Sequence, residues 1–286
     1  MATAFDKDEF FRILGKDNFS EALQYTHNCV PDFLCKWYVL QDYKSEENAE
    51  VIQKKKEQDE LRFKSLTNYQ NWFDTRFNQN DPFDMFLYNL DYDRLHEECP
   101  EDMIPVYESV IDLLRNSLLL CSFCDLDVLH LPMWANYANG HHGYCIKYRV
   151  IKKNCFYKML YEPKMIKVKS FMDMIIHDAA TVAEQKHETA DTSKLRDAFY
   201  LLNNCKHDSW EYENEYRCLY PVLEGELKGQ NVLNEQIGVE PVALYIGKDC
   251  DPDNRDRLIQ IAHDVLKCKV YVCKISKTDF LSFEEC

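Results

Sequence analysis

The stretch "MWANYANGHHGYCIKYRV" (residues 133–150) carries a clear secondary-structure signal. From residue 144 onward, successive side chains alternate between large apolar or aromatic types and mostly basic ones. The first set is Tyr144, Ile146, Tyr148 and Val150, and the second is Cys145, Lys147 and Arg149. Successive side chains of an extended chain point to opposite faces, so this alternation predicts a half-buried strand. Residues 133–137 before it predict a short helix that ends at "NG".

The sequence on either side of this strand contains further segments with the patterns of strands and of helices. Apolar or alternating patterns predict strands at 32–40, 61–66, 118–123, 210–222, 239–247 and 268–276. Helical patterns lie within the first thirty residues, at 44–60 and at 253–267. The strands do not alternate regularly with helices, which favours an α+β fold with mixed or antiparallel sheets surrounded by helices. No Pro/Gly/Ser-rich linker divides the chain, so we expect a helical segment over 1–30 and a single domain over 31–286.

Composition narrows the function classes. The 286 residues contain 34 basic and 49 acidic side chains, a formal net charge of −15. A field of this sign repels nucleic-acid phosphates and anionic lipid surfaces, so non-specific nucleic-acid binding and membrane association are not expected. No run of uncharged apolar residues is long enough to span a membrane.

The thirteen cysteines show no repeated spacing, and the N-terminus lacks the pattern of a signal peptide. We therefore expect reduced thiols in a cytoplasmic protein, most of them acting as small core residues. The one Cys-x-x-Cys, Cys121 to Cys124, has no second pair nearby. It is interpreted as a strand end whose cysteines pack inward, and no metal is expected.

The segment "WEYENEYR" (210–217) concentrates ionisable residues. If it is a strand, Glu211, Glu213, Glu215 and Arg217 share one face. The carboxylates repel one another and Arg217 relieves part of that repulsion. One interpretation is a solvated polar face. The other is a pocket in which a glutamate acts as acid or base, or holds a ribose diol.

The segment "NQNDPFD" (78–84) places Asn80, Asp81 and Asp84 around a proline. Asn or Asp before proline typically forms an Asx-turn, which would make these residues structural. The alternative is a polar loop that reaches into a site built by the strands.

Adjacent histidines, His141 and His142, follow the short helix. In extended geometry they point to opposite sides, so both binding one metal is not expected. His141 is either a structural residue or a hydrogen-bond donor to substrate. Gly140 would end the helical turn and Gly143 would permit close approach of backbone or ligand. The sequence also lacks a Walker loop and the GxGxxG, HExxH and GxSxG motifs.

Taken together, these segments resemble the bacterial domain of unknown function 2971. That family's motifs correspond here to "LCKWY" (34–38), "FNQNDPFD" (77–84), "CSFCDLDVLHLPMWANYANGHHGYCI" (121–146) and "WEYENEYR" (210–217). The family histidine then falls on His141, and the paired glutamates are Glu213 and Glu215. Two departures are an insertion at Gln79 and the absence of an arginine that usually follows the first motif.

The order of these motifs is similar to the plan of ADP-ribosyltransferases, which implies a split sheet and NAD as co-substrate. The resemblance then implies an NAD-utilising enzyme of a bacterial phage-defence or toxin context, which transfers ADP-ribose or hydrolyses NAD. In this hypothesis the catalytic residues are Glu215, Glu213 and Arg217. The ligand-binding residues are Lys36, Tyr38, Asn80, Asp81, Asp84, Trp134, Tyr137 and His141. Trp134 and Tyr137 would stack on the base.

Two alternatives stay open. One is a non-catalytic binding or regulatory subunit of a defence assembly, in which the motifs are core and interface features. The other is a metal-dependent phosphodiesterase or nuclease that uses Asp81, Asp84, His141 and Glu213. The expected partners are a small-molecule nucleotide and a protein partner or target.

Overall fold

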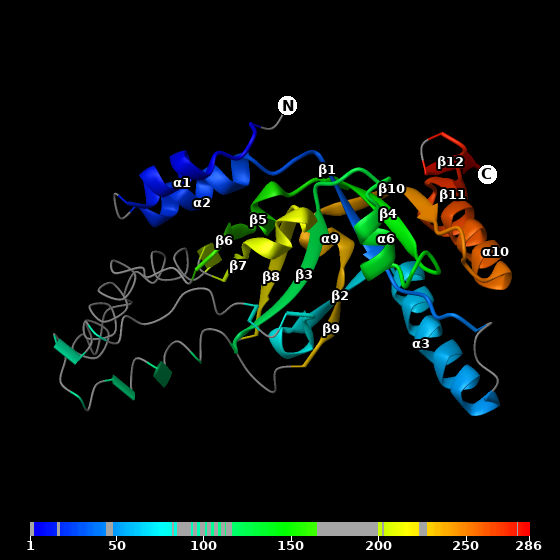
Figure 1. Ribbon diagram of the computed structural model, residues 1–286, viewed down its shortest axis with the longest axis horizontal. Helices are drawn as coiled ribbons and strands as arrows, with labels where there is room; N and C mark the ends of the chain where they lie inside the picture. Colours follow the sequence, from blue (N-terminus) through cyan, green and yellow to red (C-terminus); the bar gives the residue numbers. More distant parts are fainter. Residues whose placement is uncertain are drawn as a thin grey trace. The chain divides into compact units, whose positions relative to one another are not determined.

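The computed structural model describes residues 3–15, 18–43, 48–81, 83–84, 116–164, 200–201, 203–222, 228–278 and 280–286. It also describes 93, 96–97, 101, 104–105, 108–109 and 112. The fold is α+β, as predicted (Figure 1). Its longer described helices are α1 Lys7–Leu14, α2 Phe19–Asn28, α3 Ala49–Thr67, α6 Leu131–Tyr137 and α10 Pro252–Ile261. No finding bears on the ADP-ribosyltransferase-like arrangement of the sheet, which stays a prediction.

Most of the described strands belong to one mixed sheet. They are β1 Phe33–Tyr38, β2 Gln70–Thr75, β3 Leu118–Cys124, β4 Tyr144–Val150, β5 Phe156–Lys158, β8 Glu215–Pro221, β9 Gln230–Leu233, β10 Val239–Ile246, β11 Lys269–Ile275 and β12 Leu281–Glu285. The strand order is β12-β11-β10-β4-β1-β3-β2-β9, with β8 on β3 and β5 on β8. A separate pair joins β6 Leu160–Glu162 to β7 Cys205–His207. The strands predicted at 32–40, 118–123, 239–247 and 268–276 are confirmed as β1, β3, β10 and β11.

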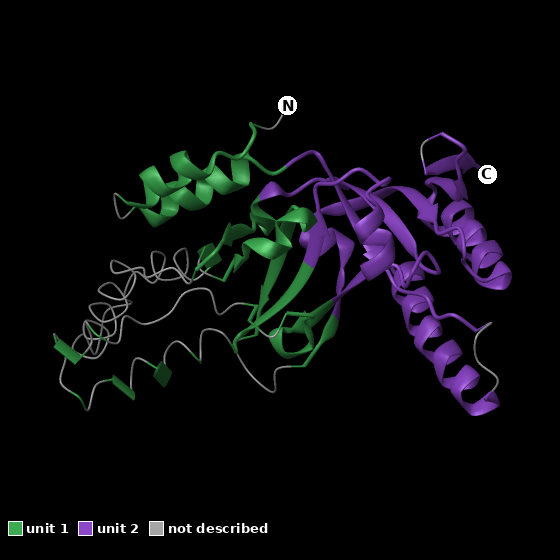
Figure 2. Cartoon of the chain, in the orientation of Figure 1, with its two compact units in different colours: residues 1–30, 73–121, 154–230 green, residues 31–72, 122–153, 231–286 purple. Residues whose placement is uncertain are grey.

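The chain divides into two compact units, each built from three separate segments (Figure 2). Unit 1 contains residues 1–30, 73–121 and 154–230, and unit 2 contains residues 31–72, 122–153 and 231–286. Each unit is described by itself below. The expectation of a single domain over 31–286 stays a prediction.

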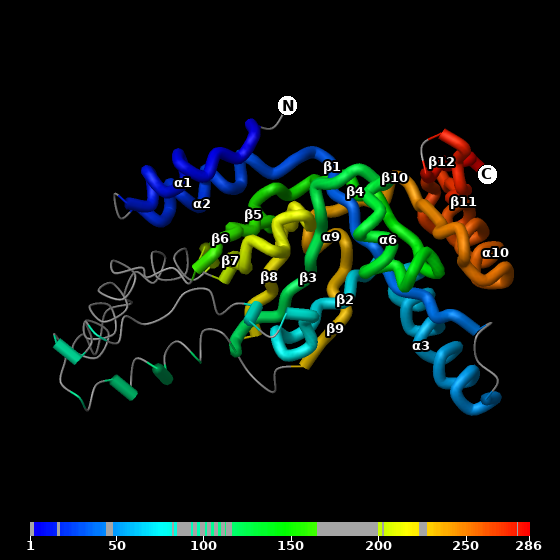
Figure 3. Tube along the Cα trace, in the orientation of Figure 1, coloured from blue at the N-terminus to red at the C-terminus, as the bar shows by residue number. Residues whose placement is uncertain are grey.

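In unit 2, β4 is the strand predicted from the alternating stretch, and it lies between β1 and β10 (Figure 3). Both pairings are antiparallel, whereas β10 and β11 run parallel. Tyr144, Ile146, Tyr148 and Val150 are all buried, as predicted for the apolar face. On the other face Cys145 is also buried, while Arg149 is exposed. The strand is therefore covered on both faces at its start and on one face at its end.

The strand predicted at 61–66 is wrong, because helix α3 runs through these residues and ends at Thr67. The buried residues of this helix are Asp59, Phe63 and Leu66. Their spacing of four and three residues places them on one helical face. Asn48 caps the start of α3, since its side-chain oxygen accepts hydrogen bonds from the amides of Glu50 and Val51. The polar helix predicted at 44–60 is thus longer at its C-terminal end.

In unit 1, α1 and α2 confirm the two helices expected within the first thirty residues. Strands β5 and β8 form an antiparallel pair, with Tyr157 opposite Arg217. A core cluster forms from Leu118, Leu120, Tyr157 and Leu219, against which Leu23 and Tyr200 pack. Leu219 of β8 belongs to this apolar core and lies on the same face of the strand as Glu215 and Arg217. These two ionisable residues therefore need charged or polar partners within the unit.

The cysteines that the structure describes are thiols, and most of them are buried. Cys121 and Cys124 are 2% and 6% exposed at the two ends of the cysteine motif, which confirms that both pack inward. None of the described helices combines the length and the apolar character needed to cross a membrane.

Candidate functional site

The segment "WEYENEYR" is not one continuous strand, which corrects the prediction for residues 210–214. Residues Asp208–Glu213 form a 3-10 helix, Asn214 adopts a left-handed conformation with φ 42°, and β8 begins at Glu215. Asparagine is one of the few residues that adopts this conformation readily. The helix turns Glu211 to solvent, while Glu213 and Glu215 are 3% and 1% exposed. A uniformly solvated face of carboxylates, the first interpretation, is therefore wrong for these two glutamates.

Arg217 lies at the centre of a buried ionic network in unit 1. Its two terminal nitrogens donate to the two carboxylate oxygens of Asp84, at 2.7 and 2.9 Å. Its Nε donates to Oε1 of Glu215 at 2.9 Å. Glu215 and Arg217 are two positions apart on β8, so they share a face of the strand, as predicted. The guanidinium thus joins the "NDPFD" loop to the "EYR" strand.

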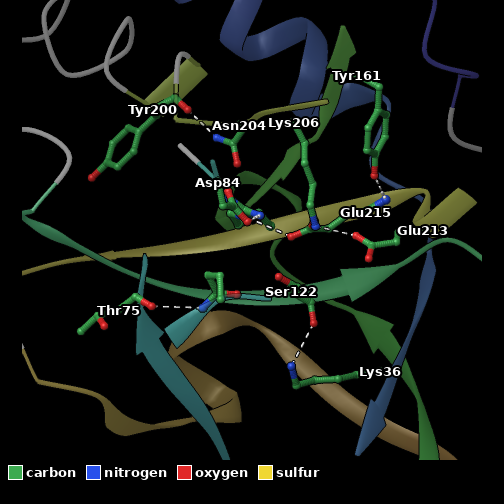
Figure 4. A network of polar contacts seen from close by, with 12 residues as sticks. Lys36, Thr75, Asp84, Ser122, Tyr161, Tyr200, Asn204, Lys206, Glu213 and Glu215 are labelled. Atoms are coloured by element: carbon green, nitrogen blue, oxygen red, sulfur yellow. Dashed lines mark hydrogen bonds and ion pairs between the residues drawn. The ribbon is translucent and has the colours of Figure 1, made fainter. Parts of the chain in front are cut away.

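Lys206, on β7, is a second cation of this network that the sequence did not single out. Its Nζ donates to Oε2 of Glu213 at 2.7 Å and lies 3.6 Å from Oε2 of Glu215. Figure 4 shows the lysine side chain reaching between the two glutamates. The ammonium also lies 4.7 Å from the centre of the Trp210 ring. The sequence did indicate that a second cation is needed, because Arg217 alone leaves the predicted carboxylates with an excess of negative charge. It did not indicate which basic residue supplies that cation.

Burial makes the charges of this network strongly interacting. Asp84, Glu213, Glu215 and Arg217 are each at most 3% exposed, and Lys206 is 6% exposed. Desolvation on burial by itself would lower the pKa of Lys206, but the nearby carboxylates outweigh it and raise that pKa. The same balance raises the pKa of Arg217, where Asp84 and Glu215 are the main carboxylates. Both cations therefore stay charged in the folded protein.

The loop that carries Asp84 confirms the predicted Asx-turn. Oδ1 of Asp81 accepts a hydrogen bond from the amide of Phe83 at 2.9 Å. The amide of Asp84 donates to the carbonyl oxygen of Asp81 at 3.0 Å. Asp81 is buried in this turn, and Asn80 is exposed. The turn directs Asp84 inward to Arg217, so Asp84 belongs to the network while Asp81 shapes the loop.

The predicted aromatic and histidine residues lie in unit 2, where Trp134 is part of the core. Its ring is fully buried and its Nε1 donates to the carbonyl oxygen of Val128. The ring of His141 stacks on it in parallel, with 5.7 Å between ring centroids. Trp37 packs edge-on at 6.4 Å. The His141 ring therefore covers one face of the Trp134 ring. The predicted stacking of a base on Trp134 stays a prediction.

His141 has a strained backbone and a desolvated side chain. Its φ is 70°, and its Nδ1 is buried without a hydrogen-bond partner in the described part of the chain. Burial lowers the pKa of His141, and the nearby Lys248 lowers it further. The neutral imidazole is thus the form that the fold favours.

This environment predicts a pH-dependent contribution to stability. A histidine with a lower pKa in the folded state takes up protons more readily when unfolded, so its contribution is lost as the pH falls below the unfolded value. The free energy of unfolding should therefore rise less between about pH 5.5 and about pH 7.5 in His141→Asn than in the wild type. Asparagine suits the positive φ. Urea denaturation at the two pH values measures the difference, with His142→Asn as the control. An unchanged pH slope in His141→Asn would contradict the prediction.

The remaining predicted residues of unit 2 have structural contacts. The Lys36 ammonium donates to the carbonyl oxygen of Ser122 at 3.0 Å and lies 5.5 Å from the Tyr38 ring centre. The Tyr38 hydroxyl lies 2.6 Å from Oδ1 of Asn71. Tyr137 is partly buried at the end of α6. Their predicted ligand-binding roles stay predictions.

The structure thus brings Asp84, Glu213, Glu215 and Arg217 together and adds Lys206. Among the described residues, no group of three or more histidine, cysteine, aspartate or glutamate side chains has a geometry suited to a metal ion. Both oxygens of Asp84 accept hydrogen bonds from Arg217. The arrangement is an ionic cluster that can hold carboxylates as anions in a fixed orientation.

These features define an α+β protein with a buried ionic network at the start of β8. Residues 133–218 match the family model described as "Protein of unknown function (DUF2971)". These residues are similar to that family, and the resemblance inferred from the motifs is confirmed over this range. The motifs at 34–38 and 77–84 precede the matched residues. No curated protein and no solved structure matches the chain.

Proposed function

We propose that this protein is an NAD-utilising enzyme that breaks the bond between nicotinamide and ribose, with its chemistry in unit 1. The observation that carries the proposal is the convergence of Glu213 and Glu215 on the Lys206 ammonium, beside Arg217. A cation at ion-pair distance favours the ionised form of a buried carboxylate. The pair is therefore suited to act as a preorganised anion.

Such an anion stabilises the charge that develops in this reaction. When the C1′–N1 bond breaks, nicotinamide leaves with the bonding electron pair and the ribose becomes an oxocarbenium cation. A fixed carboxylate lowers the energy of that cation without reorganising, and burial strengthens the interaction. Water, or a nucleophilic group of a protein target, then attacks C1′ and gives up a proton to the carboxylate. The products are nicotinamide and either ADP-ribose or ADP-ribosylated target.

The biological setting belongs to the same proposal. A bacterial defence or toxin context follows from the family resemblance, and it suits an enzyme that consumes NAD or modifies a protein. The substrate would be the nucleotide itself, and a protein would serve as target or partner. NAD is consumed in the proposed reaction as a co-substrate.

One observation also favours a non-catalytic function. The five charged side chains of the network are buried and make ion pairs with one another, as a structural core requires. In that case the protein would be a binding or regulatory subunit, and its glutamates would hold β7, β8 and the "NDPFD" loop together. Loss of a carboxylate would then lower the stability of the protein, and neither the wild type nor the variant would turn over NAD.

The experiment that separates these functions compares Glu215→Gln with the wild type. We expect the wild type to release nicotinamide from NAD, and the variant to lose about 100-fold or more of this rate, because a neutral amide cannot stabilise the oxocarbenium. Nicotinamide is measured by chromatography, and thermal unfolding checks that the variant is folded.

The matched control is Glu211→Gln, because Glu211 is the exposed glutamate of the same segment. This variant should keep the wild-type rate. Equal rates for Glu215→Gln and the wild type would overturn the proposal. The alternative of a metal-dependent phosphodiesterase or nuclease is tested by adding excess chelator. Its activity would disappear with the metal, so activity that survives the chelator excludes it.

A further inference from the structure

The two glutamates of the network differ in their relation to the cations. Oε2 of Glu213 accepts a hydrogen bond from Lys206 at 2.7 Å. The distance from Lys206 Nζ to Oε2 of Glu215 is 3.6 Å, which is an ion-pair distance and longer than a hydrogen bond. Glu215 instead accepts from Nε of Arg217 at 2.9 Å. Each carboxylate therefore has its own hydrogen-bonding cation.

The backbone explains why the two carboxylates meet the cations differently. Glu213 is the last residue of the 3-10 helix and Glu215 the first of β8, with the left-handed Asn214 between them. Asn214 is held in turn by Lys158, whose ammonium donates to its side-chain oxygen. The amide of Glu215 donates to the hydroxyl of Tyr161 at 2.8 Å. The bend at Asn214 is thus fixed from two strands, β5 and β6.

Lys206 is poorly suited to act as a nucleophile or a base. Its raised pKa keeps the amine protonated, so its lone pair is not available for attack. Its ammonium is confined between Glu213 and the ring of Trp210. A protonated amine held in this way acts on its neighbours through charge and geometry.

We propose that Lys206 is a positioning residue: it fixes Glu213 as its counter-ion and so leaves Glu215, oriented by Arg217, as the carboxylate that meets the substrate. The role of Glu215 toward a substrate rests on the proposed function. The pairing of Lys206 with Glu213 stands on geometry alone and can be tested without any substrate.

The substrate-independent test uses two double variants on a Lys206→Met background. Methionine removes the ammonium and leaves Glu213 buried without the cation that donates to it. Glu213→Gln added to Lys206→Met removes that charge, while Glu215 keeps Arg217. Glu215→Gln added to Lys206→Met leaves the Glu213 charge in place and removes a partner of Arg217. We therefore expect Glu213→Gln, and not Glu215→Gln, to recover at least half of the Tm lost on Lys206→Met.

The outcomes of this test are distinct. Recovery by Glu213→Gln alone supports the pairing, and so does a Lys206→Met chain that fails to fold when the double variant with Glu213→Gln folds. Equal recovery by both second substitutions, or recovery by Glu215→Gln alone, overturns it. The absence of any loss of Tm in Lys206→Met also overturns it.

The kinetic test measures nicotinamide release by the single variants. Glu215→Gln should lower kcat about 100-fold or more, and Glu213→Gln about 10-fold or less, with KM nearly unchanged in both. Lys206→Met should lower kcat, and adding Glu213→Gln should restore part of it. A larger loss in Glu213→Gln than in Glu215→Gln overturns the assignment. A wild type without nicotinamide release overturns the proposed function and leaves the stability test to decide the pairing.

Discussion

Arg217→Met should lower the free energy of unfolding by about 3–5 kcal/mol, the range measured when one partner of a buried ion pair is removed. Methionine fills much of the volume of the arginine stem but donates no hydrogen bond. Asp84 loses two hydrogen bonds and Glu215 loses one. Both carboxylates are 2% exposed or less, so the loss of these hydrogen bonds to a cation costs more than it would at the surface. Urea or guanidinium denaturation measures the loss.

Arg257→Met in unit 2 is the matched control. Arg257 also donates through two nitrogens to one carboxylate, that of Glu60. These side chains are 40% and 60% exposed, so solvent screens the pair and hydrates either partner alone. The expected loss is about 0–1 kcal/mol, as for other surface pairs. Equal losses in the two variants would show that the network of Arg217 is not an electrostatic centre of the fold.

The pH dependence separates charge from packing in Arg217→Met. A buried carboxylate that lacks its cation has a higher pKa when folded than when unfolded, so it binds more protons in the folded state. The free-energy cost of burying this carboxylate as an anion is then small at low pH. It grows as the pH rises above the pKa that the carboxylate has in the unfolded chain. The deficit relative to the wild type should therefore be smaller at about pH 5 than at about pH 8. A deficit that is constant with pH would indicate lost packing alone.

The fold could be predicted from the sequence wherever one face of an element is apolar at a regular period. The alternation from residue 144 gave β4, and the apolar runs gave β1, β3, β10 and β11. The error at 61–66 has a physical cause, because "LRFKSL" is short and its apolar residues fit either period. The segment is helical because Phe63 and Leu66 are buried together with Asp59 on one face of α3.

The candidate site was predictable in its residue types and less so in its geometry. Glu213, Glu215, Arg217 and Asp84 were selected from two motifs far apart in the sequence, and the network joins them. The 3-10 helix was not predictable from the alternation of "WEYENEYR", because Asn214 reverses the backbone locally and resets the register. Lys206 could not be chosen from its neighbours in the sequence, since only the long-range pairing of β7 with β6 places it there.

The second large loss of stability is expected at Gly143, in the stretch of residues 133–150. A Cβ added to this residue would lie 1.9 Å from the carbonyl oxygen of Tyr38 and 3.1 Å from Cα of Ala138. Both neighbours are backbone atoms, so no side chain can rotate away to make room. Gly143 also donates to the carbonyl oxygen of Ala138 at 2.8 Å and accepts from the amide of Gly247 at 2.9 Å. The close approach predicted from the sequence is thus an approach of backbone to backbone.

Gly143→Ala should therefore separate β1 from the start of β4 and lower the free energy of unfolding by about 3 kcal/mol, the upper end for overpacked sites. Gly140→Ala in the same loop is the control, since no atom lies within 4 Å of its added Cβ and the cost is confined to its φ of +60°. That cost is about 1–2 kcal/mol, and Gly140→Asn should reduce it. Denaturant unfolding of the three variants ranks the two effects. A loss in Gly140→Ala that equals or exceeds the loss in Gly143→Ala would mean that backbone conformation, and not the contact with Tyr38, requires these glycines.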